Sequence, residues 1–220
     1  MTVISTTRMV LVVLLGWSTM AVADESAPGN DHSRTRLMGM EGEITWEPLL
    51  HEEGLEGWET SGDPWTPDAW SREGHTVISQ TTTGSKTRLL QGDSGWKNYE
   101  LKVQGTLVKG SNLQIPFRIS EDGQAFYFLD CLMGWQAVSI SKRDPTTGVT
   151  KLDVANFSIE YGREYDIVIA VRGHSIRSYI DGQLVNVLSD DTHIRGAVGL
   201  ATWGRNTMAR FRDPMIRHYH

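Results

Sequence analysis

Apolar and polar residues alternate with a period of two along most of this 220-residue chain. In residues 98–108 the apolar side chains occupy one set of alternate positions, and residues 112–120 repeat the pattern. Such alternation is typical of strands with one buried and one exposed face. Nothing long has the spacing of a helix, and residues 190–194 make at most one short turn. We therefore expect layers of sheet packed against sheet.

Short glycine-containing turns separate the expected strands. Glu-Asp-Gly at 121–123 and Asp-Gly at 181–182 supply residues that tolerate positive φ, so they predict tight reversals of the chain. From residue 164 onward the strands follow one another as a meander. These features predict an all-β fold, an antiparallel two-sheet jelly-roll sandwich whose curved sheets leave a concave face open to a ligand.

The first 43 residues are expected to lie outside this domain. An aliphatic run from Met9 to Leu15 and the small residues Ala21-Val22-Ala23 predict a signal peptide over residues 1–23. Residues 24–43 are polar and predict a flexible leader, and residues 44–220 form the single jelly-roll domain. The predicted location is secreted or periplasmic. No span of the membrane is expected after signal cleavage, because no later apolar run is long enough.

Charge and cysteine content exclude some functions. The formal net charge is −6, so a nucleic-acid partner is not expected. The only cysteine, Cys131, allows no intrachain disulfide, and stability must come from a core. Because Cys131 lies in an apolar run, we predict a buried and inert thiol.

The segment from Gly196 to Trp203 allows two interpretations. Small residues alternate with larger ones and lead up to Trp203. A flat strip that ends in an indole can support the apolar face of a sugar ring. The alternative is that the small residues only let another layer approach closely.

Three stretches, in order along the chain, carry a family resemblance. They are Trp-Glu-Pro-Leu-Leu at 46–50 with Gly-Leu-Glu-Gly-Trp at 54–58, Asn-Leu-Gln-Ile-Pro-Phe-Arg at 112–118, and Gly-Ala-Val-Gly-Leu at 196–200 with Phe-Arg-Asp at 211–213. They resemble the opening, the "N-S-G-(I/V)-F-F-R" strand and the closing segment of the 3-keto-disaccharide hydrolase domain family, which is concanavalin A-like. The resemblance implies an exported jelly roll that acts on glycosides oxidised at the sugar 3-position. Laminin G-like domains share the general plan.

The chain departs from the family pattern where acidic and polar residues are expected. Ala201 and Trp203 replace a glutamine and a histidine of the closing motif. Ala125 and Tyr127 replace a glutamate and a glutamine, which leaves Asp130 as the only acidic residue of that strand's motif. The departures put catalysis in question and leave binding unaffected.

Four residues are the candidate site. Arg118, on the polar side of its strand by alternation, is the predicted clamp for sugar oxygens, since a guanidinium presents a fixed fork of donors. Trp203 and Trp135 are the predicted stacking platforms. Asp130 is the predicted catalytic acid or base, and pairing with Arg118 is its structural alternative. Asn112 is expected to be a turn residue that starts its strand.

The favoured hypothesis is a carbohydrate-active domain that binds a modified glycoside and cleaves its glycosidic bond as a hydrolase. The alternative is a non-catalytic carbohydrate-binding or adhesion module of the laminin G type, and the third is a structural domain of the envelope. The expected partner is a carbohydrate or glycoside. No metal ligands and no cofactor are assigned, and a divalent metal stays open because acidic loops such as Ser-Asp-Asp at 189–191 can hold calcium.

Overall fold

A computed structural model describes residues 45–51, 54–63, 69–82 and 86–219, all within the compact unit Glu43–His220. The predicted signal peptide and leader, residues 1–43, lie outside the described residues and stay predictions. Within the described part of the chain, no helix has the length and apolar character needed to cross a membrane.

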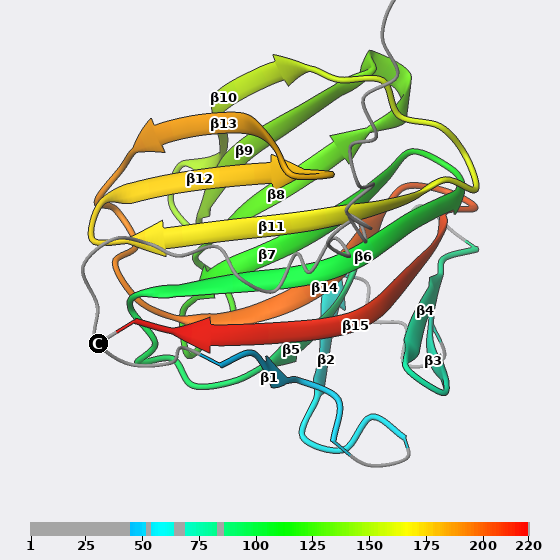
Figure 1. Cartoon of the computed structure of the whole chain (residues 1–220), viewed down its shortest axis with the longest axis horizontal. Helices are drawn as coiled ribbons and strands as arrows, with labels where there is room; N and C mark the ends of the chain where they lie inside the picture. The colour runs from blue at the N-terminus through cyan, green and yellow to red at the C-terminus, as the bar shows by residue number, and fades with distance from the viewer. Residues whose placement is uncertain (1–44, 52–53, 64–68, 83–85, 220) are drawn as a thin grey trace, which may run out of the picture. The chain divides into compact units, whose positions relative to one another are not determined.

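Two antiparallel sheets make up the domain, as the alternation predicts (Figure 1). The eight-stranded sheet contains, in order, β13 (Gln183–Ser189), β12 (Ser175–Ile180), β11 (Glu164–Arg172), β6 (Tyr99–Lys109), β15 (Met208–His218), β4 (Thr76–Gln80) and β3 (Trp70–Glu73), with β1 (Glu47–Pro48) also paired to β15. The seven-stranded sheet contains β10 (Gly148–Asn156), β9 (Ala137–Asp144), β8 (Phe126–Leu132), β7 (Asn112–Ile119), β14 (Ala197–Trp203), β5 (Lys86–Gln91) and β2 (Glu59–Asp63).

The core lies between the two sheets. The inward-facing apolar residues of β6, β11, β7 and β8 are at most 4% exposed. Gly105 of β6 leaves the space there, since a Cβ at that position would lie 2.9 Å from both Ile167 Cδ1 and Leu113 Cδ1. Cys131 is buried in this core, as predicted. Alternation therefore sets both the pairing register and the composition of the interior.

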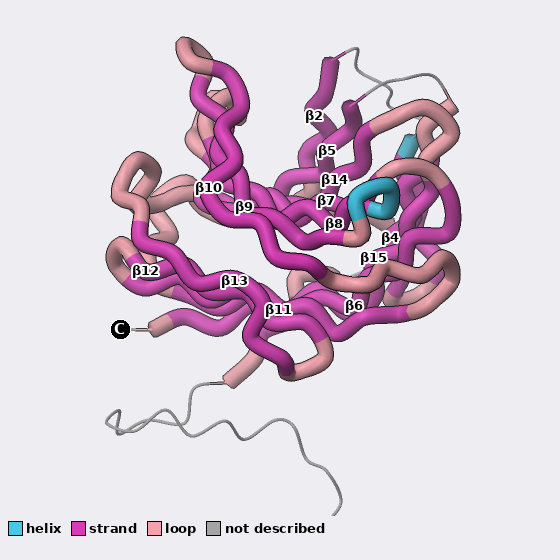
Figure 2. Tube along the Cα trace, turned by 90° about the horizontal axis from the view of Figure 1, so that it is seen from above, coloured by secondary structure: helices cyan, strands magenta, loops and turns pink. Residues whose placement is uncertain are grey.

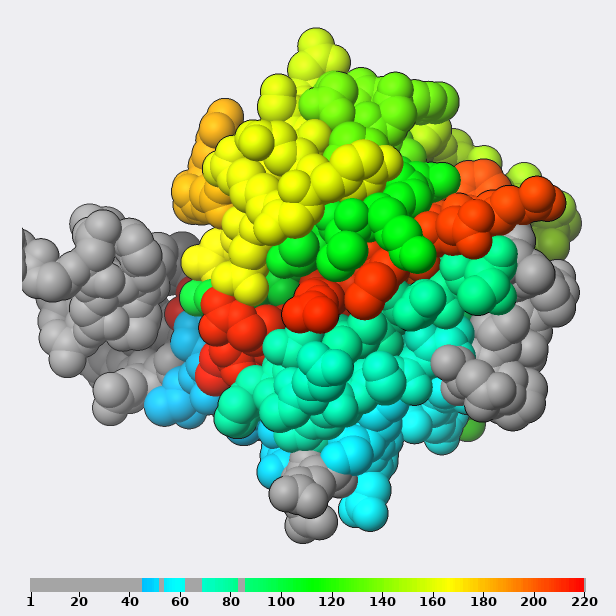
Figure 3. All heavy atoms as spheres, turned by 90° about the vertical axis from the view of Figure 1, so that its right-hand side faces the viewer, coloured from blue at the N-terminus to red at the C-terminus, as the bar shows by residue number. Residues whose placement is uncertain are grey.

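The seven-stranded sheet is strongly curved. Figure 2 shows β10 and β9 rising on one side and β2 and β5 on the other, with β7 and β8 between them. The eight-stranded sheet closes the opposite side of the core, and in Figure 3 β15 crosses diagonally between β6 and the β3–β4 hairpin. The outer face of the seven-stranded sheet is thus concave, in accord with the predicted jelly roll.

In the strip of small residues on β14, Gly199 is buried and allows neighbouring parts of the chain to approach closely, so the strip does not form an open platform for a sugar. A Cβ at Gly199 would lie 2.8 Å from the carbonyl oxygen of Leu89 and 3.1 Å from Leu90 Cδ2. Ala201 is also buried. Of the outward-facing residues in this strip, Trp203 at the end of β14 is the one that is well exposed.

Candidate functional site

A groove of about 940 Å³ lies on the concave face of the seven-stranded sheet. Strands β5, β7, β8, β9 and β10 supply its floor and walls, and the loops after β6 and β8 close one end. Its lining includes three of the four predicted site residues, which are Asp130, Trp135 and Trp203. The fold therefore brings together residues that are 73 positions apart in the sequence.

The strand registers fix a row of side chains across the groove floor. Gln114 of β7 pairs with Ala201 of β14 on one side and with Asp130 of β8 on the other. Asp130 in turn pairs with Ser139 of β9, and Ala201 pairs with Arg88 of β5. Directly paired residues point to the same face, so the row places Asp130 near the middle of the sheet.

Asp130 is a buried carboxylate held by two amides. Asn112 Nδ2 donates to Asp130 Oδ1 at 2.8 Å, and Gln114 Nε2 donates to Asp130 Oδ2 at 3.1 Å. The side chain is 4% exposed, and burial raises the pKa of Asp130 to about 6, an effect that the two amides and the positive charge of Lys151 partly oppose. A carboxyl group with such a pKa exchanges a proton close to neutral pH.

Two indoles flank this carboxylate and remain open to ligand. Trp203 is 47% exposed and Trp135 is 64% exposed. Asn112 connects the first to Asp130, because its Oδ1 accepts from the backbone N–H of Trp203 at 3.0 Å. Lys151 connects the second, since its Nζ lies 4.5 Å from the centroid of the Trp135 ring. Asn112 is therefore part of the site rather than only the turn residue that the sequence predicts.

The position of Trp135 depends on a short 3₁₀ helix, η2 (Met133–Trp135), between β8 and β9. Gln136 follows it at a φ of 48° and donates from Nε2 to the carbonyl oxygens of Met133 and Ile159. These bonds fix the turn that presents the indole to the groove.

Arg118 does not line the groove, contrary to the expectation from strict alternation. Its φ is 50°, and the pairing of β7 with β14 shifts register there, so Arg118 sits in a β-bulge. The fully buried side chain donates to the carbonyl oxygens of His193, Lys97 and Gly173 at 3.2, 3.1 and 2.7 Å. The arginine thus joins three loops outside the groove. It does not pair with Asp130, whose partners are the amides of Asn112 and Gln114.

Sequence reasoning missed several lining residues. Phe126 and Phe128 of β8 form a small apolar cluster on the groove floor, and Tyr161 approaches from the loop before β11. The parity of β8 could have found the phenylalanines, because they share a face with Asp130. Arg143 and Lys151 come from β9 and β10, and their approach depends on pairing that the local sequence does not encode.

Metal ligation has no support from the described residues. Among them, no group of three or more His, Cys, Asp or Glu side chains is placed to hold a metal ion. The groove lining in the described part of the chain contains one carboxyl group, that of Asp130.

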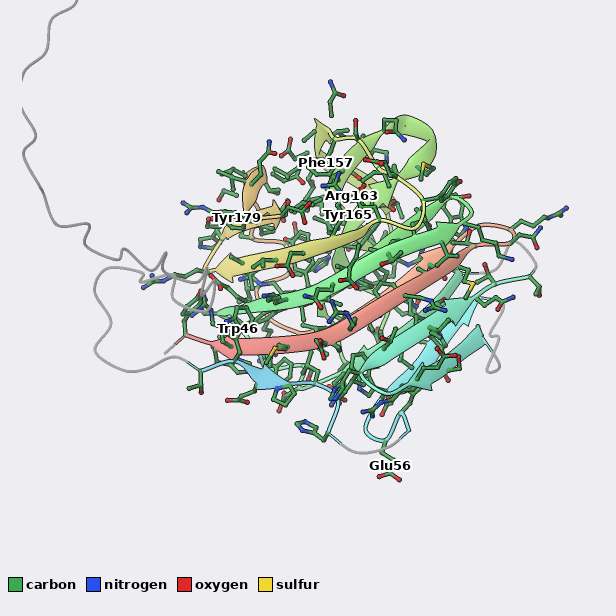
Figure 4. The ribbon with its side chains drawn as sticks, turned by 45° about the vertical axis from the view of Figure 1, so that its right-hand side comes forward. Trp46, Glu56, Phe157, Arg163, Tyr165 and Tyr179 are labelled. Atoms are coloured by element: carbon green, nitrogen blue, oxygen red, sulfur yellow. The ribbon has the colours of Figure 1, made fainter. Side chains whose placement is uncertain are left out.

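The opposite face of the domain offers aromatic side chains away from the groove. Figure 4 shows Trp46 beside β15 and Tyr179 on β12, both on the side of the eight-stranded sheet. The guanidinium of Arg217 lies 4.5 Å from the Trp46 ring centroid. Tyr179 is half-buried and does not line the groove.

A family model matches residues 45–217. It describes the 3-keto-alpha-glucoside-1,2-lyase-like domain. The match covers nearly the whole unit that the structure describes, and it confirms the resemblance that the three sequence stretches indicate.

The chain is similar to one enzyme in sequence and to two solved structures in fold. An extracellular exo-alpha-L-arabinofuranosidase from Streptomyces chartreusis is 30% identical over 139 residues, which is 60% of this chain but only 16% of that protein. The carbohydrate binding module CBM66 from Bacillus subtilis superposes with a TM-score of 0.64 at 17% identity, covering 73% of this chain and 95% of the module. A beta-glucanase from Bacillus licheniformis gives 0.55 at 14% identity, covering 82% and 100%.

Proposed function

The chain belongs to the 3-keto-alpha-glucoside-1,2-lyase-like domain family, and on that premise we propose that its groove binds a 3-keto-glycoside and cleaves the glycosidic bond with Asp130 as the base. The observation that carries the proposal is a buried carboxylate with a pKa of about 6, placed at the groove floor between two exposed indoles. The indoles would stack on the sugar rings while Asp130 reaches the reacting carbon.

A single carboxylate favours elimination over hydrolysis by two carboxyl groups. A two-carboxylate glycosidase needs its second group roughly 5 to 9 Å away, and the described groove lining provides none. In a 3-keto sugar the C2–H bond is acidified by the adjacent ketone. Asp130 would take that proton, the electron pair would form the C1–C2 double bond, and the C1–O bond would break with its electrons leaving on the aglycone oxygen.

The positive charge beside Asp130 supports the same step. Lys151 lowers the pKa of Asp130 against the effect of burial, so its ammonium group acts on the groove floor. A cation there stabilises the negative charge that develops on the ketone oxygen as the proton leaves. Protonation of the leaving oxygen, by the Asp130 carboxylic acid just formed, completes the proton balance.

The test uses purified protein and a 3-keto-glucoside with a chromogenic aglycone. We expect release of the aglycone by the wild type, loss of turnover with retained binding in Asp130→Asn, and weaker binding in Trp135→Ala and Trp203→Ala. Tyr179→Ala is the matched control and should bind as the wild type does. Equal turnover in Asp130→Asn would refute the catalytic role, and unchanged binding in both tryptophan variants would refute the groove.

A second candidate is a carbohydrate-binding module without catalysis. The high exposure of Trp135 and Trp203 favours it, because open aromatic platforms suffice for binding a glycan. The two functions separate in one experiment. Retention of a glycan that depends on Trp203, with no turnover of any 3-keto-glycoside, would leave binding as the function.

We also propose that the chain acts outside the cytoplasm, either secreted or in the periplasm. The signal peptide predicted over residues 1–23 supports this location, and the Streptomyces relative is described as extracellular. Expression of the whole chain in a bacterial host should give an exported protein that begins at Asp24. Retention of residues 1–23 on a cytoplasmic product would contradict the location.

A further inference from the structure

The charge of the groove differs in sign from that of the whole chain. The described lining residues carry one acidic side chain, Asp130, and four basic ones, which are Lys86, Arg88, Arg143 and Lys151. The chain as a whole has a formal net charge of −6. Positive charge gathered in one concave surface of an acidic protein attracts anionic ligands, because field lines are focused there.

Two of these cations belong to residues that neighbour one aromatic side chain, that of Phe126. The guanidinium carbon of Arg88 lies 4.7 Å from the centroid of Phe126. Arg143 of β9 is the direct register partner of the same phenylalanine. Phe126 and Phe128 thus form an apolar floor with a guanidinium group from β5 and another from β9 beside it.

Neither charge is neutralised in the described part of the chain. Arg88 donates to two neutral acceptors, the carbonyl oxygen of Gly123 at 2.8 Å and Ser61 Oγ at 3.3 Å. No described carboxylate lies within 4.0 Å of either guanidinium group. Burial and the positive charge of Arg143 lower the pKa of Arg88, so the two cations repel each other. An anion bound between them would relieve that repulsion.

We infer that this end of the groove is a subsite for an anionic substituent, a carboxylate or a sulfate carried by the glycoside, with Arg143 and Arg88 as its donors and the Phe126 floor beneath the sugar ring. The inference rests on the proposed function and narrows its ligand to acidic saccharides. Guanidinium groups match either oxyanion, since both present pairs of oxygens to the fork of N–H donors.

Binding of three oligosaccharides of equal length tests the subsite: an oligogalacturonate, a sulfated galactan fragment and the uncharged galactan fragment. The full exported chain is titrated with each by calorimetry at low and physiological salt. We expect a charged saccharide to bind about tenfold more tightly or better than the neutral one, because a charge-assisted hydrogen bond contributes more than a neutral one. The charged partner that binds more tightly identifies whether a carboxylate or a sulfate is the natural substituent.

The decisive variant is Arg143→Gln, with Arg177→Gln on the exposed face of β12 as the matched control. Arg143→Gln should abolish the preference for the charged saccharide and reduce its salt dependence, and the control should change neither. Unchanged preference in Arg143→Gln would overturn the subsite, as would equal affinity of the wild type for all three saccharides. Failure of the proposed function is distinguishable, because it would appear as no turnover of any 3-keto-glycoside by a wild type whose preference for the charged saccharide is intact.

Discussion

Replacement of Asp130 by asparagine should change how the stability of the domain depends on pH. Burial raises the pKa of Asp130 from its ordinary value of 3.8 to about 6 in the folded protein. A raised folded pKa means that folding favours the protonated form of Asp130, so the stability that this group contributes is fully present below pH 4 and is lost as the pH rises through 6. A shift of roughly two units at 1.36 kcal/mol each amounts to about 3 kcal/mol.

Asparagine keeps the shape of the carboxyl group and cannot ionise. The variant should therefore be about as stable as the wild type at pH 4 and gain on it by about 3 kcal/mol at pH 8. Urea unfolding of both proteins across this range measures the difference. Asp122→Asn is the control, and its change in stability should have the opposite sign. Hydrogen bonds from Ser120 Oγ and the Gln124 N–H lower the pKa of Asp122. This variant should therefore be less stable than the wild type above pH 4. A flat difference for Asp130→Asn would refute the account of its burial.

Three further changes test the fold around the groove. Gly196→Ala should destabilise the protein by more than about 2 kcal/mol, because the new Cβ would lie 2.3 Å from the carbonyl carbon of Arg118. In the control Gly134→Ala the new Cβ meets no atom within 4 Å, so this variant should be as stable as the wild type. Equal melting temperatures for the two variants would contradict the prediction. Arg118→Met should cost at least about 3 kcal/mol in chemical denaturation, since three carbonyl oxygens lose their donor, and a cost as small as that of Arg177→Met would contradict the buried tie. Burial raises the pKa of the Cys131 thiol, so it should react with a thiol reagent only as the protein unfolds. Rapid labelling in native buffer would contradict the burial of this side chain.

Strand parity, the alternation of side chains between the two faces of a strand, predicts much of this fold because it is a local property of the sequence. The alternation in residues 98–108 and 112–120 predicts two strands, and the structure has β6 and β7 there. Parity also separates Tyr127 from Asp130, and the structure buries the first in the core while the second lines the groove. Trp203 ends β14 and Trp135 follows β8 of the same sheet, and both line the groove on its concave face.

Arg118 shows where parity fails. A positive φ at a non-glycine residue turns its side chain out of the alternation, and nothing in residues 112–120 marks that position. The cause lies elsewhere in the chain, where Gly196 packs against the Arg118 carbonyl carbon and the hydroxyl of Tyr99 accepts from its N–H. The cationic groove has a similar origin, because Arg88 and Arg143 meet only through the pairing of distant strands.

Titration of the Asp130 carboxyl carbon by NMR tests the central claim most directly. In protein labelled at the aspartate carboxyl carbon, the signal missing from Asp130→Asn should titrate near pH 6, as the burial of this group implies. Addition of a saturating glycoside should move both the resonance and its midpoint, because the ligand covers the groove floor between Trp135 and Trp203. A glycoside that binds and leaves this resonance unchanged would contradict the proposal that the groove is the site.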